Sequence, residues 1–229
     1  MNIQIVVFQI IVLVFSAIIH EYMHAWMADR LGDPTAKDLG RLTLNPIPHI
    51  DIFGSIILPF VLVITGSGFV IGWAKPVPFN PNNLRDKKYG SAKVALAGPM
   101  GNFITALFFG LIMRFFPISS LMKTGIIVSF FTGNYSMLST LVSETYLASI
   151  FLFFIIIVFI NLLLMVFNLV PVPPLDGSKV IMPFLPYNWQ IKYLSLERYG
   201  MFLVLAFVIF GFSIIIPIIY FLFRLIVGG

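Results

Sequence analysis

The sequence predicts an all-α integral membrane protein, and three observations support this fold class. Of the 229 residues, 59% are hydrophobic and only 10% are charged. The mean hydropathy is +1.02, and long apolar runs recur along the whole chain, as expected for helices embedded in lipid. No stretch between these runs is long enough for a second domain, so residues 1–229 are predicted to form one polytopic domain.

Five apolar runs are candidates for membrane helices, because a helical crossing needs about 20 residues. They are Ile3–Met27, Ile52–Trp73, Val94–Phe116, Thr145–Val170 and Tyr199–Val227. The first run has no basic residue before Arg30, so it lacks the positive start of a secretory signal and is predicted to be a retained helix with its start outside. In total we expect about four to six transmembrane helices.

His20, Glu21 and His24 form the pattern His-Glu-x-x-His deep in the first run. On a helix that starts at Ile3, His20 would lie ~26 Å along the axis, inside or at the far edge of a hydrocarbon core about 30 Å thick. Histidines four apart share one helix face and can bind one ion, while Glu21 can take a proton from a water on that ion. This is the arrangement of zinc hydrolases. Two histidines satisfied only by neighbouring helices would be an improbable accident in a chain that has three histidines.

A second polar motif, NLVPVPPLDG from Asn168 to Gly177, closes the fourth run. Its prolines must end the helix, and Gly177 is expected to allow a sharp turn after Asp176. The carboxylate of Asp176 would then lie at the depth of the two histidines, as a third zinc ligand beside a position kept for water. His49 and Asp51 remain open as alternative ligands or as partners of the ligands.

The second run, Ile52–Trp73, is predicted to be a re-entrant hairpin that does not cross the membrane. Three runs separate the first helix from Asp176, and if all three crossed, the carboxylate would face the opposite side from the histidines. Pro59 and Gly66-Ser67-Gly68 interrupt this run. We expect a short helix that enters the membrane and an extended return through Phe69–Phe79, which places an edge strand beside the metal.

The basic residues support this topology, because positive charge gathers on the inner side of a membrane. The predicted inner loops hold eleven of the 14 lysines and arginines: Arg30, Lys37, Arg41, Lys75, Arg85, Lys87, Lys88, Lys93, Lys179, Lys192 and Arg198. The net charge of +5 is therefore explained by topology, with no basic helix that would favour nucleic acid. The segment Pro117–Ser143 is predicted to be an outer loop at the membrane surface. The absence of cysteine excludes disulfides and thiolate zinc ligands.

HEYMH in the first helix and NLVPVPPLDG after the fourth resemble the site-2 protease family of intramembrane zinc metalloproteases, peptidase family M50. Three further stretches resemble its short bacterial and archaeal branch, which lacks a PDZ domain. These are GRLTLNPIPHIDIFGSIILP (Gly40–Pro59), GWAKPVPFNP (Gly72–Pro81) and AGPMGNF (Ala97–Phe103). The likeness extends from about His20 to Gly177.

The resemblance implies one zinc ion per chain, held by His20, His24 and Asp176, with Glu21 as general base and acid. Asn168 matches the asparagine of the family's NPDG-type motif and would donate to the scissile carbonyl or its oxyanion; alternatively it only caps its helix. Four residues of the hairpin's return are expected to bind substrate: Gly72, Trp73, Ala74 and Lys75. For Asn102, in the small-residue stretch Gly98-Pro99-Met100-Gly101, packing is the preferred role.

The expected activity is hydrolysis of peptide bonds in membrane-embedded proteins or peptides, such as membrane-tethered regulators or leftover signal peptides. The catalytic core would cover residues 1–180, with a C-terminal helix over 199–227, in the inner membrane of a prokaryotic cell with the site toward the cytoplasm. Two alternatives are a metal-ion transporter, for which a ladder of ligands across several helices would be needed, and a catalytically silent membrane-binding relative, against which intact Glu21 argues.

Overall fold

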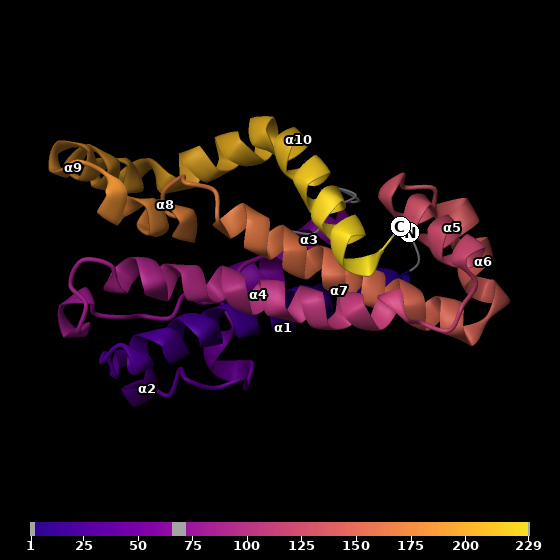
Figure 1. The fold of residues 1–229 in the computed structure, drawn as a ribbon, viewed down its shortest axis with the longest axis horizontal. Helices are drawn as coiled ribbons and strands as arrows, with labels where there is room; N and C mark the ends of the chain where they lie inside the picture. Colours follow the sequence, from indigo (N-terminus) through magenta and orange to yellow (C-terminus); the bar gives the residue numbers. More distant parts are fainter. Residues whose placement is uncertain (1–2, 66–71, 229) are drawn as a thin grey trace.

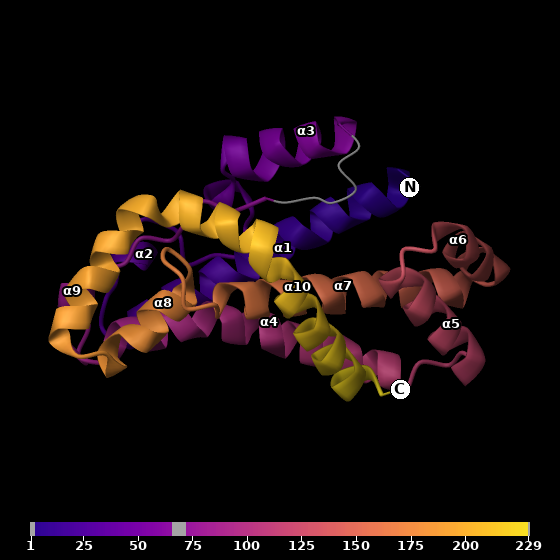
Figure 2. The same ribbon diagram turned by 90° about the horizontal axis from the view of Figure 1, so that it is seen from above.

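This computed structural model describes residues 3–65 and 72–228, and within these ranges the fold is helical, without a strand. Three long helices lie side by side along the long axis of the molecule (Figure 1). They are α1 (Ile3–Arg30), α4 (Gly90–Arg114) and α7 (Tyr146–Asn168). A fourth, α10 (Gly200–Val227), bends as it runs back over α7 and α4 (Figures 1 and 2). The predicted all-α class is confirmed.

Shorter helices occupy the two ends of this bundle (Figures 1 and 2). At one end lie α2 (Thr35–Asp38), α8 (Asp176–Ile181) and α9 (Tyr187–Ser195). At the other end lie α5 (Ser120–Phe131) and α6 (Tyr135–Glu144), close to where α1 begins and α10 ends. Single 3-10 turns are formed by Ile47–His49, Pro81–Asn83, Met182–Phe184 and Leu196–Tyr199.

Four helical segments of the described chain are long and apolar enough to cross a membrane, so the protein is a membrane protein. They are Ile5–Arg30, Gly90–Arg114, Tyr146–Asn168 and Tyr187–Gly211, the last of which runs through α9 into α10. The second half of α10, Ser213–Val227, is a shorter apolar helix. Its side chains Ile215, Ile219 and Phe223 are buried against the bundle, whereas Phe202 and Ile209 in the first half are exposed.

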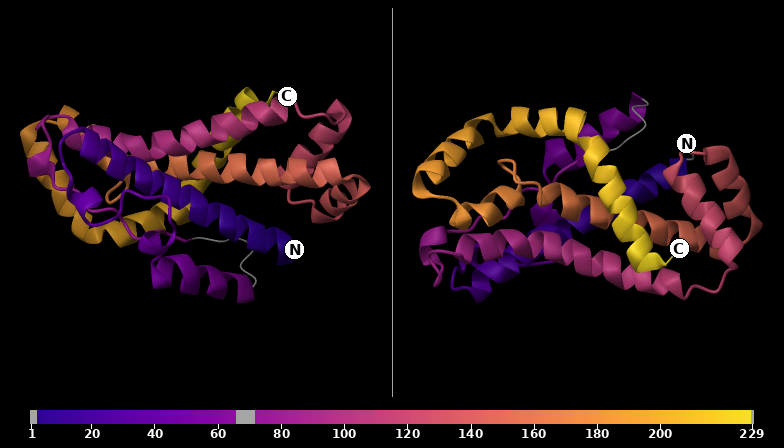
Figure 3. Two further views of the ribbon diagram at one scale, coloured as in Figure 1. Left: turned by 90° about the horizontal axis from the view of Figure 1, so that it is seen from below. Right: turned by 45° about the horizontal axis from the view of Figure 1, so that its top comes forward.

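Within its described residues, the run Ile52–Trp73 forms no long helix, and its two ends lie side by side, as the hairpin prediction requires. A π-helical turn over Ile52–Ile57 leads into α3 (Leu58–Ile64), which stands apart from the bundle, beyond α1 as seen from α4 and α7 (Figures 2 and 3). The two ends of the hairpin meet, because the N–H of Trp73 donates to the carbonyl of Gly54 at 3.1 Å. The Gly66–Gly68 break and the start of the return at Phe69 lie outside the described residues.

The predicted edge strand is not formed in the part of the return that the structure describes. The backbone of residues 72–80 has no regular secondary structure and belongs to no ladder. The physical reason is the alternation in Lys75-Pro76-Val77-Pro78, because each proline lacks the N–H that a ladder would use. The return is therefore held by single hydrogen bonds to neighbouring loops, one of which joins the N–H of Lys75 to the carbonyl of His49 at 2.8 Å.

The segment predicted as an outer loop, Pro117–Ser143, instead forms most of a helical pair, α5 and α6, that joins the main core. Ile126 in α5 and Leu138 in α6 are fully or almost fully buried. Phe131 at the end of α5 packs edge to face on three rings of other helices, those of Phe159, Tyr220 and Phe223. These ring contacts join α5 to α7 and α10 at the end of the bundle opposite α8.

Candidate metal centre and active site

The two histidines of α1 and the first residue of α8 come together at one point. The Oδ2 atom of Asp176 lies 2.9 Å from Nε2 of His20 and 3.1 Å from Nε2 of His24. One ligand atom from each of the three residues lies within 4.8 Å of the others, as a single metal ion requires. His20 and Asp176 are buried, and the imidazole rings stand edge to face with centroids 4.6 Å apart. The three side chains predicted as ligands are thus neighbours in space.

The second nitrogen of each imidazole identifies the tautomer. Nδ1 of His24 lies 2.7 Å from the carbonyl oxygen of Val94, which can only accept, so Nδ1 carries the hydrogen. Nδ1 of His20 lies 2.7 Å from Oδ1 of Asn102, whose amide nitrogen donates elsewhere. In the neutral imidazoles, each Nε2 atom is then a lone-pair donor that faces a carboxylate oxygen. Three electron-pair donors so close repel one another unless a cation lies among them, so the donor set fits Zn²⁺.

Two glycines allow the helices to approach this cluster. A Cβ atom on Gly98 would lie 2.4 Å from Nε2 of His24, so α4 can cross the ligand face only with glycine at this position. A Cβ on Gly177 would lie 2.2 Å from the carbonyl oxygen of Leu169. Gly177 does not have positive φ, so the expected sharp turn is not the reason for this residue. It is required because α8 begins in contact with the backbone that ends α7.

Glu21 lies beside the cluster, and one of its oxygens is occupied by a backbone donor. Its Oε2 atom accepts from the N–H of Val77, in the hairpin's return, at 2.7 Å. Val77 is buried and packs with Ala25 of α1 and Ala36 of α2. The carboxylate is therefore tied to the hairpin as well as to its own helix. This contact was not predicted, because no pattern in the sequence relates Val77 to Glu21.

Asp33 anchors the same return segment further along. Its Oδ2 accepts from the N–H of Asn80 at 2.6 Å, and its Oδ1 accepts from the side chains of Thr35 and Asn83. Burial raises the pKa of Asp33, but the hydrogen bonds from Thr35, Asn83 and Asn80 outweigh it and hold this pKa below its ordinary value. The ionised carboxylate therefore fixes the end of the return against the loop that follows α1.

A buried amide network connects the site to the bundle. The amide nitrogen of Asn102 donates to the carbonyl of Ser16 at 3.0 Å and to Oδ1 of Asn161 at 2.9 Å. Asn161 in turn donates to the hydroxyl of Ser16 at 2.9 Å. Both asparagines are fully buried. Asn102 thus does more than pack, and Asn161 joins the site without having been predicted. Its position as the one polar residue of FIIIVFINLLLM could have identified it.

The remaining candidates form hydrogen bonds with other partners within the described residues. The amide of Asn168 donates to the carbonyl of Leu164 one turn earlier, at 2.9 Å. Nε2 of His49 lies 2.9 Å from the carbonyl of Thr43, to which it donates. Asp51 caps the hairpin, because its Oδ1 accepts from the N–H of Gly54 at 2.7 Å. His49 and Asp51 therefore shape the hairpin's start and are not among the three clustered ligands.

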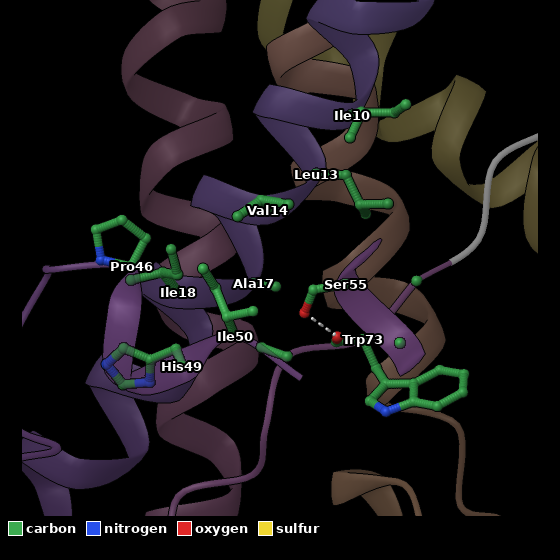
Figure 4. A pocket seen from close by; sticks show the side chains of 13 residues that line it. Ile10, Leu13, Val14, Ala17, Ile18, Pro46, His49, Ile50, Ser55 and Trp73 are labelled. Atoms are coloured by element: carbon green, nitrogen blue, oxygen red, sulfur yellow. Dashed lines mark hydrogen bonds between the residues drawn. The ribbon is translucent and has the colours of Figure 1, made fainter. Parts of the chain in front are cut away.

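Three of the four predicted substrate-binding residues line a small cavity beside α1, and Trp73 is seen at its edge (Figure 4). Gly72, Trp73 and Ala74 help to line a cavity of ≈20 Å³, whose opposite wall is the α1 stretch from Ile10 to Ile18. Such a volume holds about one water molecule. The hydroxyl of Ser55 donates to the carbonyl of Trp73 at 2.8 Å and closes the hairpin over this wall. Lys75 is exposed and does not line the cavity.

These features define a class of protein: a membrane protein with a His-His-Asp metal site and an adjacent carboxylate. This is the set of residues that a metal-dependent hydrolase needs. Comparison with known proteins agrees. The model of the family described as Peptidase family M50 matches residues 8–211. The chain belongs to peptidase family M50 and is an intramembrane zinc metalloprotease of that family.

Individual relatives are consistent with this assignment. YwhC of Bacillus subtilis, named as a proposed zinc metalloprotease, is 37% identical over 200 residues, which cover 86% of this chain and 78% of that one. Rip2 of Mycolicibacterium smegmatis, named in the same way, is 28% identical over 196 residues, or 85% of this chain and 63% of the relative. A third, from Methanocaldococcus jannaschii, is 30% identical over 153 residues, 66% of this chain and 63% of its own. No solved structure matches the chain significantly.

Proposed function

We propose that this metalloprotease holds one Zn²⁺ per chain with His20, His24 and Asp176, and that it cleaves peptide bonds of membrane-embedded substrates. The observation that carries the proposal is the convergence of two Nε2 atoms and one carboxylate oxygen within 4.8 Å, next to Glu21 in the same helix. Three protein ligands leave a position for water, as in catalytic zinc sites.

Each residue has a defined part in this hydrolysis. When bound, zinc supplies a Lewis acid that polarises the scissile carbonyl and makes the attacking water more acidic. Glu21 accepts the proton of that water and then delivers it to the leaving amine. Asn168 is proposed to donate to the oxyanion with the second N–H of its amide, because the first donates to the Leu164 carbonyl.

The substrate is proposed to bind in extended form along the hairpin's return. In extended backbone, the N–H groups of alternate residues point to opposite sides. Those of Trp73, Lys75 and Val77 donate to groups of the protein itself. The other side offers the N–H groups of Gly72 and Ala74, and the prolines that follow have none. Pairing with substrate would therefore be confined to Gly72–Lys75, and the substrate helix must unwind before its amides can pair there.

The same arrangement supports a proposal for the membrane topology. The elements and loops that carry the eleven inward basic residues gather at the end with α2, α8 and α9 (Figure 1). We assign this end to the cytoplasmic face of a prokaryotic cell membrane, with α5, α6 and the start of α1 outside. The hairpin over Ile52–Trp73 enters the membrane and returns. Residues 1–229 then act as one domain, with the catalytic core over about 1–180.

One experiment separates this function from its alternatives, a metal transporter and a catalytically silent relative. Within the described residues, the three ligands form a single cluster and not a ladder across the membrane. The purified chain, reconstituted with a tethered model substrate, should cleave it, lose cleavage after zinc is removed with a chelator, and regain it on zinc addition. Zinc flux into vesicles without cleavage would instead favour a transporter, and zinc binding with neither activity would favour the silent relative.

A further inference from the structure

The carboxylate of Glu21 accepts a hydrogen bond from a backbone N–H that lies between two prolines. Val77 stands between Pro76 and Pro78, so among these three residues Val77 alone has an N–H. That N–H donates to Oε2 of Glu21 at 2.7 Å. We propose that the backbone N–H of Val77 is a positioning group for the catalytic carboxylate, which it holds in place for proton transfer.

The donor is fixed from several directions. The side chain of Val77 is 9% exposed and packs with Ala25 and Ala36, and the flanking prolines restrict their own φ angles. Two residues earlier, the N–H of Lys75 donates to the carbonyl of His49 at 2.8 Å. Further along, Asp33 holds the N–H of Asn80 at 2.6 Å. The donor therefore cannot follow the carboxylate if the glutamate side chain rotates.

This hydrogen bond gives the two carboxylate oxygens of Glu21 different roles. Oε2 is engaged by the hairpin, and Oε1 is left for the water whose proton must be taken. A glutamate side chain has considerable rotamer freedom, and a fixed charge-assisted hydrogen bond reduces it before substrate arrives. General-base catalysis depends on a donor–acceptor distance of about 2.6–3.2 Å, so the orientation of this side chain controls the rate.

The contact also links two parts of the site. The segment that offers Gly72 and Ala74 to substrate continues directly into Val77, so substrate docking and the base belong to one continuous stretch of backbone. A shift of the hairpin would therefore move the donor of Glu21. This inference rests on the proposed role of Glu21 as the base, and it adds a residue whose side chain takes no part in the chemistry.

The test removes the N–H and keeps the side chain. In vitro translation can replace Val77 with α-hydroxyisovaleric acid, which turns the amide into an ester; Val77→Pro is the genetic counterpart, and Val77→Ala is the matched control that keeps the N–H. Each variant is reconstituted in nanodiscs, and zinc content, kcat and KM for a tethered substrate are measured. We expect kcat to fall roughly 10- to 100-fold in the ester and proline variants, with zinc content unchanged and KM within about twofold. Val77→Ala shortens the buried side chain but keeps the N–H, so its kcat should fall less than that of the ester variant.

Other outcomes are equally informative. A wild-type kcat in the ester variant would overturn the proposal, and so would a higher kcat, because the contact would then restrain an inactive carboxylate. If Val77→Pro loses zinc or fails to fold, the ester variant decides. An active Glu21→Gln variant measured alongside would refute the base assignment itself, which keeps that failure separate from a failure of the positioning role.

Discussion

Replacement of Asn102 by leucine tests the buried network behind the metal site. Asn102→Leu removes the acceptor of the His20 Nδ1 hydrogen, 2.7 Å away, and the donor that serves Ser16 and Asn161. Leucine has a similar size and keeps the helix, so the change is mainly one of hydrogen bonding. His20 would lose the partner that fixes its tautomer and its ring orientation.

The magnitude follows from the hydrogen bonds that this substitution removes. Loss of the partner of a metal-ligating histidine typically weakens metal affinity 10- to 100-fold, which is about 1.4–2.7 kcal/mol. The three broken hydrogen bonds also lower the free energy of unfolding, by about 2 kcal/mol in total at the average value measured inside membranes. Metal affinity and folding stability therefore change together in this variant.

Asn161→Leu is the matched control that separates the two effects. It removes the hydrogen bonds of Asn161 with Asn102 and Ser16 but leaves the Asn102–His20 hydrogen bond in place. We expect a similar loss of stability, with zinc affinity changed by less than about threefold. Zinc affinity is measured by competition with a chelator of known affinity at fixed pH, and stability by unfolding in detergent. Wild-type zinc affinity in Asn102→Leu would refute the reasoning.

Three further outcomes are expected. Asp176→Ala should lose zinc on dialysis, as read by elemental analysis, because two imidazoles alone hold it weakly; full retention would point to His49 or Asp51. The stabilisation from Asp33, whose pKa is lowered in the fold, should be complete at neutral pH and lost below about pH 4; Asp33→Asn should remove this part of the pH dependence, and an unchanged acid limb in unfolding scans would contradict it. Single cysteines at Lys37 and Arg85 should label with an impermeant maleimide from one side of oriented vesicles, and Lys123 from the other; labelling of the first two from opposite sides would mean that the hairpin crosses.

Hydropathy located the long helices because lipid contact and helix formation coincide in them. The run Thr145–Val170 became α7, Tyr146–Asn168, and its start is set by the hydroxyl of Thr145, which caps the helix by accepting from Ala148. The first apolar run ends at Met27, but helix α1 continues to Arg30, because the polar residues that follow the run remain helical. Such ends depend on caps and not on apolarity.

The hydrogen bonds that complete the site could not be predicted, because they join residues far apart in the chain. His20 and His24 follow from a spacing of four on one helix, and Asp176 from the break at the end of another. Nothing local relates Asn161 to Asn102, which lie 59 positions apart, or Val77 to Glu21, 56 positions apart. Both hydrogen bonds depend on how α4, α7 and the hairpin pack on α1.

Local patterns also failed where packing decides the conformation. The mixed polarity of Pro117–Ser143 predicts a loop. The structure instead forms α5 and α6 there, because Ile126 and Leu138 are buried in the main core. The hairpin's return is predicted to be an edge strand, but Pro76 and Pro78 have no N–H to donate to a β-ladder.

Glu21→Gln tests the central claim most directly, since it changes one carboxylate to an amide and leaves all three ligands in place. Zinc content and cleavage of the tethered substrate are measured on the same reconstituted sample. We predict one zinc ion per chain, as in the wild type, with cleavage reduced by at least about 10²-fold, because an amide cannot accept the proton of water. Cleavage at a rate close to wild-type with zinc retained would contradict the assignment of Glu21 as the base.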